Sequence, residues 1–184
     1  MISVEPTEKL CEQIRSINGV TVVHAAVAGE NGTAIFNVME NSQTSTILPN
    51  SSESTLAQVS VRTLTLPTLF AEHHLDRVDL LKMDIEGSEI ALFDSTPDDV
   101  LKKISQISVE FHDFCGLITP QQADQVEHRL AGLGFSRIGL TRANRADTLF
   151  YQPKACGVSG VQSLYAKWVS KYLIGYKRVR ARRA

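Results

Sequence analysis

The sequence lacks any long apolar run. No stretch of about 18 apolar residues occurs in the 184 residues, so a transmembrane helix is not expected. The N-terminal segment carries acidic residues early and has no apolar h-region, which argues against a signal peptide. Cys11, Cys115 and Cys156 form no Cys-x-x-Cys pair, and their odd number argues against a disulfide framework. We therefore expect a cytoplasmic protein whose cysteines are small, semi-buried hydrophobic side chains.

The C-terminal segment lacks acidic residues. Residues 154–184 hold eight Lys or Arg and no Asp or Glu, whereas residues 1–153 hold eleven Lys or Arg and all twenty acidic residues. We predict a domain over residues 1–153 and a basic helix or tail over residues 154–184. Aromatic residues lie among the basic ones, so the tail could contact an anionic lipid surface or a nucleic acid. The alternative is a solvated helix end.

Hydrophobic periodicity predicts an α/β fold. Strands 20–29 and 33–38 can form a hairpin, and the Ser- and Thr-rich segment 41–58 is predicted to be a loop, either a plain connector or a flap over a site. We expect a mostly parallel sheet whose last two strands close the edge as an antiparallel pair. The expected helices are 8–17, 67–72, 88–93, 119–130 and 161–179, and the further strands are 59–66, 78–83, 107–111, 135–140 and 147–152.

Charged residues crowd the end of the predicted strand 78–83. Lys82, Asp84 and Glu86 come where the apolar run stops, and Gly87 allows a sharp turn after them. Ligands of open parallel sheets bind at the carboxyl ends of the strands, so these charges can line a polar site above the core. Burying them without a partner would be costly.

The next predicted strand ends in a similar way. Glu110 and His112 follow its apolar residues, so two neighbouring strand ends offer Asp84, Glu86, Glu110 and His112 to one cleft. The alternative interpretation is an ion-pair and capping cluster without chemistry. The segment Asp84-Ile85-Glu86 also resembles the first Asp-x-Glu motif of two-metal exonucleases, but no convincing set of further Asp-bearing motifs follows.

The stretch LLKMDIEGSEIALFDS resembles the signature of the FkbM family of methyltransferases. Further segments resemble that family in the same order along residues 2–152: SVEPTEKL, HAAVAGENGTAIF, VSVRTLTLPTLF and ISVEFHD. The resemblance implies a Rossmann-like class I fold and an O-methyltransferase that uses S-adenosylmethionine. It also implies that the methyl group goes to a hydroxyl of a sugar, a glycan or another small metabolite.

The resemblance also implies roles for particular residues. Glu5, at the end of an apolar stub, would accept hydrogen bonds from both ribose hydroxyls of the cofactor, while Ala25 and Ala26 would pass by the adenine. His24 alone is expected to be a satisfied strand histidine rather than a ligand.

Catalysis is assigned to three residues, one of which also serves the cofactor. Asp84 is expected at both the cofactor and the catalytic site, together with Glu86 and His112. His112 has the natural pKa for a general base. Asp84 and Glu86 could instead act as the base, orient the substrate or bind a divalent metal, and the residues do not separate these roles.

The sequence departs from the family in one respect. No glycine-rich loop that would cradle the cofactor precedes the segment SVEPTEKL. We therefore expect a sheet without the family's first strand and first helix. Such a chain, whether a fragment or a degenerate homologue, is expected to bind S-adenosylmethionine weakly or not at all.

Overall fold

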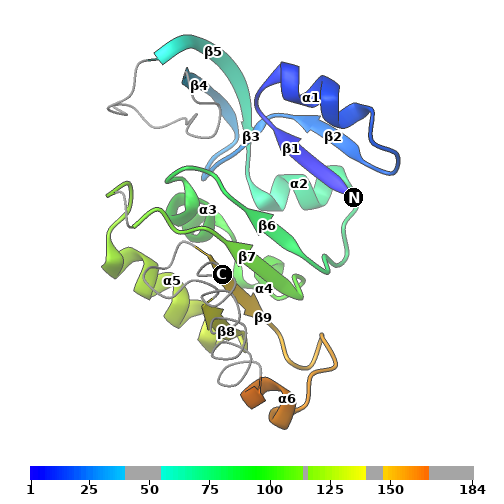
Figure 1. The fold of residues 1–184 in the computed structure, drawn as a ribbon, viewed down its shortest axis with the longest axis vertical. Helices are drawn as coiled ribbons and strands as arrows, with labels where there is room; N and C mark the ends of the chain where they lie inside the picture. Colours follow the sequence, from blue (N-terminus) through cyan, green and yellow to red (C-terminus); the bar gives the residue numbers. More distant parts are fainter. Residues whose placement is uncertain (40–54, 114–115, 140–146, 166–184) are drawn as a thin grey trace, which may run out of the picture. The chain divides into compact units, whose positions relative to one another are not determined.

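The computed structural model of the protein describes residues 1–39, 55–113, 116–139 and 147–165 (Figure 1). The chain divides into two compact units. Unit 1 comprises Met1–Asp76 and Ile85–Leu101, and unit 2 comprises Arg77–Asp84 and Lys102–Ala184. Each unit is therefore built from two separate stretches of the chain. Among the described residues, no helix is both long enough and apolar enough to cross a membrane.

A parallel pair of strands begins unit 1. Strand β1 (Ile2–Glu5) pairs with β2 (Thr21–His24), and the register sets Glu5 opposite His24. Helix α1 (Glu8–Arg15) connects the two strands and buries Cys11. The chain returns to β2 through Gly19, whose φ of 78° is a conformation that glycine adopts readily. The predicted helix 8–17 is confirmed with an earlier end.

The second sheet of unit 1 has three strands in the order β3-β5-β4. Strand β3 (Ala26–Val27) runs parallel to β5 (Thr55–Leu64), and β4 (Gly32–Met39) runs antiparallel to β5. The expected hairpin between 20–29 and 33–38 is therefore wrong, because β5 lies between β3 and β4. The predicted loop 41–58 is also wrong at residues 55–58, which belong to β5, and residues 40–54 lie outside the described part.

Three helices complete unit 1. Helix α2 (Leu66–Glu72) begins after Thr65, whose side-chain oxygen accepts a hydrogen bond from the amide of Thr68. Helices α3 (Glu89–Ser95) and α4 (Asp98–Leu101) follow later in the chain. Gly29 lies directly against α3, since a Cβ atom at Gly29 would be 3.0 Å from the Cβ of Ala91. Only glycine lets the backbone come this close.

Unit 2 contains one four-stranded sheet in the order β6-β7-β9-β8. Strand β6 (Leu81–Met83) runs parallel to β7 (Gln106–Val109), while β9 (Thr148–Tyr151) runs antiparallel to β7 and to β8 (Ser136–Gly139). The predicted antiparallel edge pair is confirmed. The predicted strand 78–83 is reduced to β6 and a single bridge between Val78 and Ile104.

The described residues of unit 2 form two helices. Helix α5 (Pro120–Gly132) begins with a capping box, in which Thr119 and Gln122 exchange side-chain and backbone hydrogen bonds. Helix α6 (Gly160–Leu164) begins the predicted helix 161–179, of which residues 166–184 lie outside the described part. The boundary predicted at residue 153 therefore stays a prediction.

The observed architecture is a mixed α/β fold. Among the described strands, three pairs are parallel (β1 with β2, β3 with β5, β6 with β7) and three are antiparallel (β4 with β5, β7 with β9, β8 with β9). The expectation of a mostly parallel sheet is corrected accordingly. It failed because the apolar pattern that identifies a buried strand does not give the direction of its neighbour.

Candidate functional site

The carboxyl ends of the parallel strands β6 and β7 lie side by side in unit 2. The register pairs Met83 with Val109, and the amide of Glu110 donates a hydrogen bond to the carbonyl oxygen of Met83 over 3.1 Å. Asp84 and Glu110 are the next residues on their respective strands. The expectation that two adjacent strand ends present acidic residues together is thus met by this pair.

The buried side chain of His112 lies close to the exposed side chain of Asp84. Its side chain is 5% exposed, whereas that of Asp84 is 42% exposed, and the two are 3.8 Å apart between Nε2 and Oδ1. This distance is longer than a hydrogen bond but within the range of an ion pair when the imidazole is protonated. The structure therefore places a buried imidazole next to a solvent-accessible carboxylate.

Glu110 has an environment that disfavours its charge. Burial is the main cause that raises the pKa of this carboxyl above its ordinary value, and the negative charges of Asp84 and Asp147 raise it further. His112 and Lys82 act in the opposite direction and only partly offset these effects. A carboxyl whose pKa is shifted by burial and by a like charge is typical of functional sites, although structural clusters produce the same shift.

The turn after β6 contains two residues in the left-handed conformation. Glu86 has φ 49° and Gly87 has φ 94°. The predicted sharp turn at Gly87 is confirmed, while the left-handed conformation of Glu86 gave no signal in the sequence. The amide of Gly87 donates to Oε1 of the buried Glu89 over 3.0 Å, which holds the turn at the start of α3. Glu86 belongs to unit 1 and Asp84 to unit 2, so their shared cleft stays a prediction.

Three of the residues expected at the cofactor lie at or just after the carboxyl ends of β1 and β2 in unit 1, whereas the fourth, Asp84, belongs to unit 2. Oε1 of Glu5 accepts a hydrogen bond from the amide of Thr7 over 2.8 Å, which fixes this carboxylate at the entry to α1. Ala25 and Ala26 are both buried, and the amide of Ala25 donates to the carbonyl oxygen of Glu5. A carboxylate has further lone pairs, so Glu5 can still accept hydrogen bonds from hydroxyl groups.

His24 is involved in more contacts than the sequence suggested. Its Nδ1 lies 2.7 Å from Oε2 of Glu8, and its Nε2 lies 3.0 Å from the carbonyl oxygen of Pro6. Both of its ring nitrogens have partners, which agrees with the expected satisfied strand histidine. The sequence did not show that Glu8 and Cys11 would lie beside it. The available signal was their spacing of three residues on α1, directly after the strand that pairs with the His24 strand.

The two described cysteines agree with the expected small, semi-buried side chains. Cys11 is buried, Cys156 is half-buried, and both are free thiols, while Cys115 lies outside the described residues.

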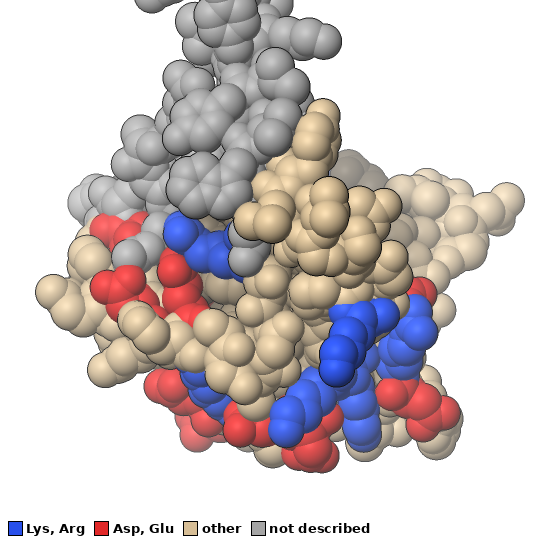
Figure 2. Space-filling view, turned by 90° about the horizontal axis from the view of Figure 1, so that it is seen from below, with Lys and Arg blue, Asp and Glu red and all other residues tan. Residues whose placement is uncertain are grey.

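The face of the molecule drawn in Figure 2 carries charges of both signs. Lys and Arg side chains lie among Asp and Glu side chains along its lower part, rather than forming a surface of one sign. Most of the basic segment lies outside the described part, so its contact with lipid or nucleic acid stays a prediction.

Comparison with known proteins gives one match. The family model described as the methyltransferase FkbM domain matches residues 1–136, from the start of β1 to the start of β8. No curated protein and no solved structure matches the chain. The matched region contains Glu5, Ala25, Ala26 and the strand-end residues from Asp84 to His112.

Proposed function

Because the chain belongs to the FkbM methyltransferase domain family, we propose that it is an S-adenosylmethionine-dependent O-methyltransferase with a Rossmann-like class I fold. The proposed acceptor is a hydroxyl of a sugar, a glycan or another small metabolite. S-adenosylmethionine, when bound, supplies an electrophilic methyl group. The protein then has to position the hydroxyl and remove its proton.

The residues at the ends of β1 and β2 fit the adenosine part of this cofactor. Glu5 would accept hydrogen bonds from the ribose hydroxyls, because its carboxylate is held in place by the amide of Thr7. Ala25 and Ala26 are proposed to lie next to the adenine; they are 0% and 7% exposed, so Ala26 is the one of the two whose surface a flat base could reach. Asp84, at the end of β6, is the residue proposed to face both the cofactor and the acceptor.

The single observation that carries the proposed chemistry is the pairing of exposed Asp84 with buried His112. The difference in exposure suggests separate roles. Asp84 can be reached by an acceptor hydroxyl and would accept its proton, while His112 would hold the carboxylate in position from behind. Such base catalysis typically contributes a factor of about 10² to 10⁴ in rate. Glu86 remains a predicted second carboxylate in the same role.

The test is methyl transfer from isotopically labelled S-adenosylmethionine to a panel of mono- and oligosaccharides. Asp84→Asn should lower kcat by about a hundredfold or more, because the amide keeps the shape but cannot accept the proton. His112→Gln should lower kcat by about tenfold with little change in KM, and should alter the pH profile. Asp94→Asn is the matched control, since Asp94 is an exposed carboxylate on α3 without an assigned role.

Two outcomes would contradict the proposal. One is unchanged turnover in Asp84→Asn, which would remove the proposed base. The other is a chain that binds the labelled cofactor but transfers its methyl group to none of the hydroxylated acceptors. The alternative function, a binding module that acts through the basic tail, has no specific observation among the described residues in its favour.

A further inference from the structure

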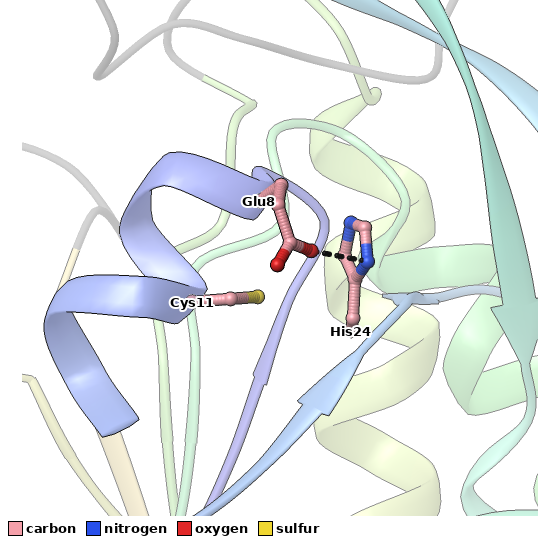
Figure 3. Close-up of side chains that lie close together, drawn as sticks. All are labelled: Glu8, Cys11 and His24. Carbon is pink, nitrogen blue, oxygen red and sulfur yellow. Dashed lines mark ion pairs between the residues drawn. The ribbon is translucent and has the colours of Figure 1, made fainter. Parts of the chain in front are cut away.

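Three metal-ligating side chains meet in unit 1, outside the residues assigned to methyl transfer. Glu8 and Cys11 project from the same face of α1, because residues three apart on a helix are neighbours. His24 comes from the end of β2 (Figure 3). One ligand atom of each residue lies within 4.8 Å of the ligand atoms of the other two. A carboxylate, a thiol and an imidazole thus converge on one point.

The imidazole of His24 has the orientation that metal ligands usually have. Its Nε2 lies 3.0 Å from the carbonyl oxygen of Pro6, and a carbonyl oxygen can only accept a hydrogen bond. The Nε2 atom therefore carries the proton and donates it. Histidine ligands of metals commonly donate their second ring N–H to a backbone carbonyl in this way. The Nδ1 atom points to Glu8, toward the convergence point.

The carboxylate of Glu8 is divided between two partners. Its Oε1 accepts a hydrogen bond from Nη1 of Arg15 over 2.7 Å, while its Oε2 lies 2.7 Å from Nδ1 of His24. Arg15 thereby holds one carboxylate oxygen in place, while Oε2 faces the imidazole of His24. The side chains of Glu8 and His24 are 51% and 40% exposed, so they can separate to admit an ion.

The thiol of Cys11 is the buried member of the group. It donates a weak hydrogen bond to the carbonyl oxygen of Glu5 over 3.2 Å. Burial raises the pKa of this thiol, and the charges of Glu5 and Glu8 raise it further. A metal ligand must be the thiolate, so an ion that binds here has to release the thiol proton to solvent.

We propose that Glu8, Cys11 and His24 form a binding site for a zinc ion, with Oε2, Sγ and Nδ1 as ligands. Sulfur and nitrogen ligands favour zinc over magnesium or calcium, which take oxygen ligands. Zinc bonds of about 2.0–2.3 Å to these three atom types fit a group of this size after small side-chain rotations. Three protein ligands leave the fourth tetrahedral position to water, so the site is open to solvent.

Titration of the full chain with Co²⁺, a spectroscopic substitute for zinc, tests the site. A thiolate bound to Co²⁺ gives a charge-transfer band in the near ultraviolet, and Zn²⁺ should abolish the band by displacement. Cys11→Ser should remove the band. His24→Asn and Glu8→Gln should each weaken Co²⁺ binding by at least about tenfold. Altering a residue that only hydrogen-bonds to a metal ligand already costs about that much affinity, so losing a ligand should cost no less.

Cys156→Ser and Cys115→Ser are the matched controls, and both should keep the band. A band that survives Cys11→Ser, or that disappears in a control, would place the metal elsewhere and overturn the proposal. The absence of any band in the wild-type chain would overturn it too. Circular dichroism of each variant separates lost binding from lost folding, and the exposed Glu8 and His24 provide variants that leave the core intact. No readout depends on methyl transfer, so the result is independent of the proposed enzyme activity.

Discussion

Two pairs of parallel strands end in acid and histidine, but the two ends have opposite electrostatics. Next to the end of β1 and β2, Glu8 of α1 lies between Arg15 and His24, and its hydrogen bond from Arg15 is the main cause that lowers its pKa. At the end of β6 and β7, burial is the main cause that raises the pKa of Glu110, followed by the charge of Asp84. The histidine is exposed in the first case and buried in the second.

This difference shows that strand topology does not decide what a strand end does. Parallel pairing brings acidic and basic residues to a common edge in both units. Whether they form a relaxed ion pair or a group with a perturbed pKa depends on burial and on the nearest countercharge. Arg15 supplies that countercharge in unit 1. In unit 2 it is supplied only partly, by His112 and Lys82.

The largest expected effect concerns the two histidines. His112→Ala should lower the free energy of unfolding by about 2 kcal/mol, because it removes a buried side chain and leaves a cavity with unpaired polar groups. His24→Ala should change it by less than about 0.5 kcal/mol, as is usual for exposed positions. Urea unfolding in the presence of a chelator, which removes any metal contribution, measures both. Equal losses would mean that the two strand ends do not differ in burial.

The second prediction concerns the turn through which the chain leaves β6. Gly87→Ala should lower the free energy of unfolding by about 1–2 kcal/mol, since residues with a Cβ atom are disfavoured at φ 94°. Glu86→Gly is the matched counterpart at φ 49°, where glycine fits the backbone, so it should lower the free energy of unfolding by less than Gly87→Ala does. Thermal unfolding of both variants gives the comparison. If Gly87→Ala were neutral, the left-handed turn would not be needed to present the strand end.

Only part of this turn could be predicted from the sequence. Gly87 was predicted to allow a sharp turn because glycine is the residue that adopts positive φ. Glu86 gave no such signal, since a positive φ is uncommon for residues other than glycine. Likewise, the positions of β7, α5 and β9 followed from apolar spacing and from the Thr119-Pro120 helix start, which are local features.

Features that depend on residues far apart in the sequence were harder to predict. The pairing of β4 with β5 was missed, because the two strands are separated by a long segment and hairpins are the default for neighbouring strands. The site showed the same pattern. Asp84, Glu110 and His112 were found because they follow strands, whereas the meeting of Glu8 and Cys11 with His24 required the register of β1 against β2.

The smallest expected effect concerns how stability depends on pH, and it should have opposite signs for the carboxylates of Glu110 and Glu8. The raised pKa of Glu110 means that its charge costs stability once the pH exceeds its folded-state pKa, and that the cost vanishes below the unfolded value of about 4.3. Glu110→Gln should therefore raise stability at neutral pH and have no effect at about pH 3. The lowered pKa of Glu8 means the reverse, with stability lost as the pH falls through its folded-state pKa.

Glu8→Gln should accordingly lower stability at neutral pH and be neutral in acid. Thermal midpoints of both variants across the range from about pH 3 to 8 test the pair. Two curves of the same sign would show that the strand ends do not have opposite electrostatics. Salt should diminish the Glu8 effect more than the Glu110 effect, because exposed charges are screened more strongly than buried ones.

The interleaving of the two units along the chain has a consequence for how the protein is made. Strand β6 is synthesised before α3 and α4, which belong to unit 1, and it receives its partner β7 only after residue 106. A nascent chain that ends near Leu101 therefore contains β6 with its hydrogen-bonding edges unpaired. Such edges favour association with other chains, so a ribosome pause in this interval would make aggregation more frequent than a pause after β9.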